Sequence, residues 1–131
     1  MTFSCLPRVK YAVIAVCLSI GILAPMAQPT EAKVCAVAPA RPTLQFPVNG
    51  NTVHSRKVDL RWGVSDCASL YSVIVLKGAT DGRPVDAAYD LHNLGYTTHR
   101  LEAGQTYWWY VEACNRNGCI TSRWGKFTIA L

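Results

Sequence analysis

The sequence has little charge and lacks the motifs on which catalysis in a small domain depends. Only 16% of its 131 residues are charged and half are apolar, a balance that excludes an intrinsically disordered chain. It contains no Gly-x-Ser-x-Gly nucleophile elbow and no Asp and Glu pair placed by a motif for acid–base work. Without its apolar amino-terminal stretch the chain has about 100 residues, enough for one small core and too few for a cofactor-dependent α/β enzyme. The sequence therefore favours a domain that is not an enzyme and holds no cofactor.

Signals for nucleic acid, metal and glycosylation are missing as well. Basic residues stand singly apart from Arg56-Lys57, so no run follows a nucleic-acid backbone. His54, His92 and His99 have no recognised ligand spacing and no Cys-x-x-Cys pair occurs, so we expect no metal site. No Asn-x-Ser/Thr sequon is present. The net charge of +5 indicates a solubility feature or a weak attraction to anionic cell-envelope polymers.

The first 32 residues have the pattern of an export signal. Arg8 and Lys10 precede an uncharged, apolar run over residues 11–24. This run of about 14 residues suits a signal peptide better than a membrane span, which needs about 20. Small residues suited to signal peptidase follow, and cleavage after Ala32 fits better than cleavage after Ala27.

Two alternatives to a cleaved signal are an uncleaved membrane anchor and a lipidated Cys17. The anchor would need a longer apolar run, and the lipidated cysteine would need a small residue where Val16 stands. Cleavage after Ala32 would reduce 13 basic and 8 acidic residues to 11 and 7, a net charge of +4. The sequence thus predicts a secreted or periplasmic protein without a membrane segment after cleavage.

Four cysteines follow the signal: Cys35, Cys67, Cys114 and Cys119. In an exported chain of this size they indicate two disulfides, for which three pairings exist, whereas their spacing disfavours metal binding. The tetrad Asn-Arg-Asn-Gly between Cys114 and Cys119 forms turns, and cysteines facing each other across such a hairpin can be bridged. We therefore favour Cys114–Cys119 with Cys35–Cys67, which leaves no thiol for catalysis.

From residue 41 onward the chain has the pattern of β-strands. Val58, Leu60 and Trp62 alternate with charged residues, which predicts a half-buried antiparallel strand. Residues 85–94 could form a short edge strand or a loop. No window has a helical stripe, and turn residues recur at short intervals. Seven short strands in about 95 residues indicate an all-β, two-sheet sandwich. Besides that at 58–62, the clearest strands are expected over residues 70–76, 96–101, 105–114 and 119–129.

The segment Leu101-Glu102-Ala103-Gly104-Gln105-Thr106-Tyr107 resembles the corner motif of fibronectin type III domains. In that motif a tyrosine that starts the sixth strand turns its hydroxyl back onto the upstream backbone. The opening Pro42-Thr43-Leu44 is typical of bacterial members, and Trp62 ends the second strand as in the family. The departures are the extra cysteine pairs and Ala103, where proline is commonest.

The resemblance implies a seven-stranded, immunoglobulin-like antiparallel β-sandwich over residues 42–131, behind a lead-in segment at 33–41. It implies structural roles for Leu101, Gly104, Tyr107 and Trp62. Because this family hosts many functions, the resemblance alone implies no activity.

An outward-facing aromatic patch is the unusual feature of the expected sheets. Since Tyr107 is expected to point inward, Trp108 and Tyr110 are expected to face outward. The family's arrangement implies that Ile74 and Leu76 lie beside them. Such a patch is a candidate platform for sugar rings or for a protein, and the alternative is ordinary cross-strand packing.

Arg123 and Trp124 near the last strand resemble half of the tryptophan–arginine ladder of cytokine-receptor modules. The repeated Trp-Ser motif is missing, so we expect a local cation–π contact and carry no ligand over from that resemblance.

Two functions remain open at this point. The first is an exported binding or adhesion module that contacts a protein or carbohydrate of the cell envelope or exterior, through the aromatic face or through loops at one end. The second is a structural or accessory envelope module without a ligand of its own. Exposure of Trp108 and Tyr110 separates the two, since buried or side-packed rings favour the structural module.

Overall fold

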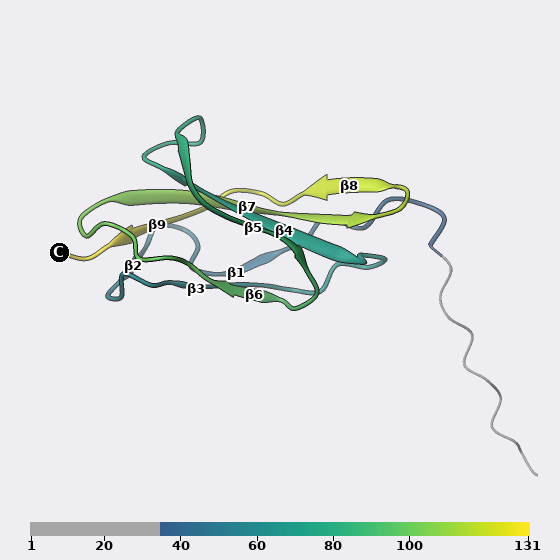
Figure 1. Ribbon diagram of the computed structural model, residues 1–131, viewed down its shortest axis with the longest axis horizontal. Helices are drawn as coiled ribbons and strands as arrows, with labels where there is room; N and C mark the ends of the chain where they lie inside the picture. The colour runs from purple at the N-terminus through teal and green to yellow at the C-terminus, as the bar shows by residue number, and fades with distance from the viewer. Residues whose placement is uncertain (1–34) are drawn as a thin grey trace, which may run out of the picture. The chain divides into compact units, whose positions relative to one another are not determined.

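The computed structural model describes residues 35–131, which form two β-sheets packed face to face (Figure 1). The predicted signal at residues 1–32 lies outside the described residues, so its cleavage and the predicted domain boundaries stay predictions. The part of the chain that is described has no helix able to cross a membrane. Its strands are β1 (Leu44–Phe46), β2 (Asn51–Val53), β3 (Asp59–Trp62), β4 (Leu70–Lys77), β5 (Arg83–Leu91), β6 (Gly95–Thr97), β7 (Thr106–Asn115), β8 (Gly118–Thr121) and β9 (Gly125–Ile129).

The smaller sheet has the order β1-β3-β6, and the larger has the order β2-β9-β7-β4-β5, with β8 also paired to β7. All pairs are antiparallel except β2 with β9. Nine strands replace the expected seven because the first and the last are each interrupted. Between β1 and β2, Asn49 and Gly50 adopt positive φ angles of 55° and 77°, and this turn moves the chain from one sheet to the other.

Two predicted strands differ in length from the structure. Residues 85–94 are an edge strand rather than a loop, since most of them belong to β5. The strand expected over 96–101 ends at Thr97. The Thr98 amide still donates to the Val58 carbonyl at 2.9 Å, but side chains take part in the other bonds that follow. The Thr98 hydroxyl accepts a hydrogen bond from the Val58 amide at 3.0 Å, and the His99 amide donates to Asp86.

The core lies between the sheets and is built from the alternating residues that the sequence indicates. Leu60 and Trp62 of β3 point inward, as do Tyr71, Val73 and Val75 of β4. From β7 and β9 come further buried side chains: Tyr107, Trp109, Val111, Ala113, Phe127 and Ile129.

The predicted tyrosine corner is present. The Tyr107 hydroxyl accepts a hydrogen bond from the Glu102 amide at 2.9 Å, and Leu101 is buried. Gly104 has a φ of 76°, a left-handed conformation that suits glycine. Its amide donates to the Ile129 carbonyl at 2.7 Å, which ties the corner to the last strand.

Candidate functional site

The register of β4 with β7 brings the predicted outer-face residues together. Ile74 lies opposite Tyr110, and Leu76 lies opposite Trp108. Ile74 and Leu76 are nevertheless buried, with 8% and 6% of their surface exposed. They therefore form the floor of the patch, and a ligand would not reach them directly.

A β-bulge that includes Trp124 lies between β8 and β9. The β7–β8 register pairs Glu112 with Thr121, whereas the β7–β9 register pairs Trp109 with Gly125 and is offset by one residue. The linking segment 122–124 thus has one residue more than its partner segment on β7. Bulges of this kind bend a strand and redirect its side chains.

Ser122 fixes the start of that bulge. Its amide donates to the Val111 carbonyl at 2.8 Å, and its hydroxyl accepts from the Val111 amide at 3.0 Å. The hydroxyl also donates to the Arg123 carbonyl at 2.7 Å. The continuous strand expected over residues 119–129 is therefore wrong at this point, and the sequence offered no signal for the break beyond the serine itself.

Trp124 is the accessible ring of the patch. It is 44% exposed and stands perpendicular to Tyr110 and to Trp108, with ring centroids 5.0 and 6.5 Å apart. Trp108 and Tyr110 are half-buried. Burial, followed by the nearby Glu112 and Tyr89, raises the pKa of Tyr110.

Trp108 has further partners that hold it in place. Its indole N–H donates to the Gly78 carbonyl at 3.3 Å, and the Lys126 ammonium lies 5.2 Å from its ring centroid. The cation on this cluster is thus Lys126, while the expected contact of Arg123 with Trp124 stays a prediction. The rings of Trp108 and Tyr110 pack against neighbouring groups and are only partly exposed, which favours a structural role for these two residues. Trp124 supplies the accessible surface of the patch.

A hollow adjoins Trp124. It has a volume of about 260 Å³ and is lined by Arg41, Arg123 and Trp124, together with residues 42–44 and 48–49. The Arg41 guanidinium donates from Nη1 to the Thr121 carbonyl at 2.6 Å. Sequence reasoning named Arg123 and Trp124 but missed Arg41, which is distant in sequence.

A second hollow of about 740 Å³ lies over β3 and β6 of the smaller sheet. Asp59 on its lining accepts a hydrogen bond from the Thr97 hydroxyl at 2.6 Å. The buried Trp62 indole nitrogen, from a residue that also lines this hollow, has no hydrogen-bond partner among residues 35–131. None of the predicted binding residues lies here.

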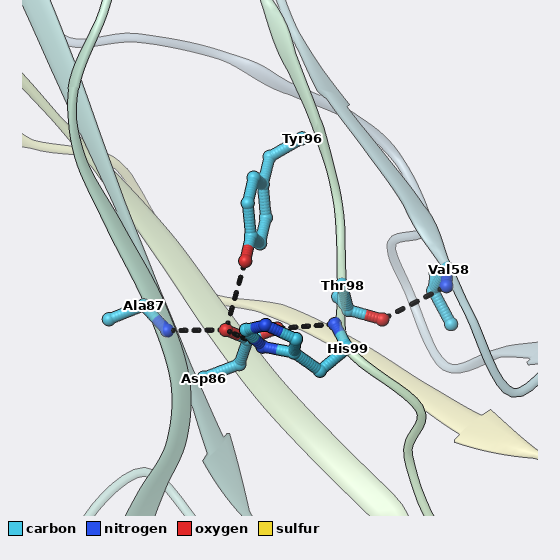
Figure 2. A network of polar contacts seen from close by, with 6 residues as sticks. All are labelled: Val58, Asp86, Ala87, Tyr96, Thr98 and His99. Carbon is cyan, nitrogen blue, oxygen red and sulfur yellow. Dashed lines mark hydrogen bonds and ion pairs between the residues drawn. The ribbon is translucent and has the colours of Figure 1, made fainter.

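The buried Asp86 carboxylate gathers a polar network that the sequence did not reveal (Figure 2). It accepts hydrogen bonds from the Ala87 amide at 2.8 Å, the Tyr96 hydroxyl at 3.0 Å and the His99 amide at 2.7 Å. His99 Nδ1 lies 3.0 Å from the same carboxylate. The network ties the β5 edge to the segment after β6, so Asp86 connects the two sheets.

The histidines do not gather. His99 is held by Asp86, and residues 35–131 contain no group of three or more potential metal-ligating side chains. Nothing in this part of the chain therefore points to a metal centre.

The disulfides are Cys35–Cys67 and Cys114–Cys119, with Cα atoms 5.7 and 4.1 Å apart. This is the pairing favoured from the sequence. The β7–β8 turn also holds the lead-in segment, because the Asn115 side-chain amide donates to the Val37 carbonyl at 2.8 Å and that of Asn117 donates to the Cys35 carbonyl at 2.8 Å.

Two packed antiparallel sheets and a tyrosine corner define an immunoglobulin-like β-sandwich. No protein-family model matches the chain, and no curated protein matches it. Solved structures do: a Fn3-like protein from Clostridium thermocellum is 15% identical with a TM-score of 0.53, and the match covers 72% of this chain and 94% of that one.

Two further structures agree with this match. A protein described as FN3tt is 17% identical with a TM-score of 0.50, covering 70% of this chain and 97% of that one. A myokine is 16% identical with a TM-score of 0.52, covering 72% and 98%. The chain therefore has the fibronectin type III fold, which hosts binding and structural modules and does not by itself define an activity.

Proposed function

We propose that this protein is an exported, non-catalytic binding module whose outer sheet surface around Trp124 contacts a glycan or a protein of the cell envelope or exterior. The observation that carries the proposal is the 44% exposure of Trp124. The exposed indole of Trp124 is an apolar surface that is supported by the rings of Trp108 and Tyr110. Aromatic side chains of this kind supply much of the contact energy in binding surfaces.

The disulfides support the exported location. Two bridges within a domain of this size are typical of oxidising compartments and rare in the cytosol. The amino-terminal pattern of charge and apolar residues supports the same location.

A structural or accessory module is the second candidate. The observation that favours it is the side-packing of Trp108 and Tyr110, whose rings are half-buried against Trp124. In this reading the aromatic cluster stabilises the sheet, and replacing Trp124 would change stability without changing any contact outside the molecule.

Retention on envelope material from the producing cells tests the proposal. Trp124→Ala should lose retention, while Leu94→Ala, which removes an apolar side chain that is 39% exposed beside the smaller sheet, should keep it. Both variants should be checked for folding by their unfolding transitions. Equal retention of Trp124→Ala and the unmodified protein would overturn the proposal and favour the structural module.

A further inference from the structure

The surroundings of Trp124 carry positive charge that the described residues do not neutralise. The Arg123 side chain is exposed, and its guanidinium makes no hydrogen bond or ion pair within residues 35–131. Arg41 uses Nη1 on the Thr121 carbonyl, which orients the guanidinium and leaves other N–H donors of its fork unused. Lys126 lies over Trp108, whose ring contacts Trp124 at a right angle.

Acidic side chains are absent from the lining of the hollow within residues 35–131. Glu112 of β7 lies across the ladder from Thr121 and is not part of this lining. The hollow beside the exposed indole is thus lined by two arginines and, in the described part of the chain, by no carboxylate. This balance disfavours a cationic occupant and favours an anionic one.

The geometry also limits the size of the group that fits. The hollow has a volume of about 260 Å³ and opens beside one exposed ring. A specific protein interface buries about 800 Å² on each partner around an apolar centre, whereas this hollow is bordered by one exposed indole. A sugar ring that carries its own anion suits this combination better than a protein surface does.

We propose that the hollow between Arg41 and Arg123 binds the carboxylate of a uronic acid residue in an acidic polysaccharide while the sugar ring packs on Trp124. The inference rests on the proposed function and specifies its ligand. The planar guanidinium groups suit a carboxylate because each can form two parallel hydrogen bonds with it. The indole supplies an apolar surface for the C–H groups of the ring.

Affinity electrophoresis through gels that contain polysaccharide tests the inference. The probes are polygalacturonate, alginate and hyaluronate, each compared with its carboxyl-reduced, neutral form at physiological salt. We expect at least one acidic polymer to bind about tenfold more tightly than its neutral form, in line with charge-assisted hydrogen bonds to the carboxylate. Equal binding of the acidic and neutral forms, or no binding of any acidic polymer, would overturn the inference.

Matched variants separate a site from diffuse charge. Arg123→Gln should weaken binding about tenfold, as the loss of a guanidinium–carboxylate contact implies. Arg116→Gln removes the same charge from the exposed β7–β8 turn and should leave binding within about twofold. Equal weakening by both variants would mean that net charge alone drives binding, which contradicts a built site.

The experiments distinguish a failure of this inference from a failure of the proposed function. If no acidic polymer binds but Trp124→Ala still loses retention on envelope material, the ligand is a protein or a neutral glycan and only the inference falls. If Trp124→Ala is retained like the unmodified protein, both fall.

Discussion

At the scale of single residues, alternate side chains of β7 have different roles. One set is buried and stabilises the fold, and the other set lies on the outer face. Tyr107 is buried and anchors the corner through the Glu102 amide. Trp108 and Tyr110 lie on the opposite face. The resemblance to the corner motif predicted this division, because the corner tyrosine points inward and every second side chain of a strand lies on the same face.

Tyr107→Phe should destabilise the protein by about 1 kcal/mol, because it leaves the Glu102 amide without its acceptor while keeping the buried ring. Denaturant unfolding followed by fluorescence measures the loss. Retention on envelope material should not change, since the outer face is untouched. A variant as stable as the unmodified protein would contradict the role of the corner bond.

Tyr96 gives a pH dependence whose sign follows from its surroundings. Burial, then the hydrogen bond and negative charge of Asp86, raises the pKa of Tyr96 above its ordinary value near 10. The folded state therefore favours the neutral phenol. Its contribution to stability is complete below the unfolded pKa and is lost as the pH rises through the higher folded value.

The difference in unfolding free energy between the unmodified protein and Tyr96→Phe should accordingly stay constant from pH 7 to 9 and shrink above about pH 10. Using the difference cancels the titration of the other tyrosines. A difference that grows in alkali would show that the sign of the Tyr96 shift is wrong.

At the scale of strands, the sequence predicted the elements whose apolar residues alternate and missed those set by single polar side chains. β3, β4 and β7 follow from period-two patterns. β5 was ambiguous because its inward position holds Asp86, an acid that is buried only because Tyr96, Ala87 and His99 supply donors. Such partners are distant in sequence and follow no pattern that can be read along one strand.

The candidate site was also predictable only in part, where a pattern along one strand determines it. The outer-face position of Trp108 and Tyr110 followed from the inward-pointing tyrosine of the corner motif, whereas the accessibility of Trp124 depends on the bulge at residues 122–124. The hollow depends on Arg41, which the Thr121 carbonyl holds across 80 residues of sequence. Tertiary contacts of this kind leave no local signature.

The two disulfides should contribute unequally to stability. Replacing Cys35 and Cys67 with serine opens a loop of 32 residues and should cost about 3–4 kcal/mol in the chain-entropy model. The matched change at Cys114 and Cys119 opens a separation of 5 and should cost about 2 kcal/mol. Denaturant unfolding of the two double variants measures both, and a larger loss from the shorter loop would contradict this order.

At the scale of the whole molecule, the fold could be predicted and the ligand could not. A tyrosine corner and seven strand signals define a sandwich whose solved relatives are only 15–17% identical, because the same core geometry tolerates many side chains of suitable size. The identity of a ligand depends on a few surface groups from separate strands. In the proposed site those groups are Trp124 and the two arginines beside it.

The indole N–H signals of the four tryptophans in a two-dimensional ¹H–¹⁵N NMR spectrum test the central claim most directly. Each tryptophan gives one signal, which Trp→Phe variants assign. During titration with solubilised envelope material, the Trp124 signal should move, the Trp108 signal should follow through ring contact, and the signals of the buried Trp62 and Trp109 should stay fixed. Movement at Trp62 with a fixed Trp124 signal, or no movement at any of the four, would contradict a binding surface around Trp124.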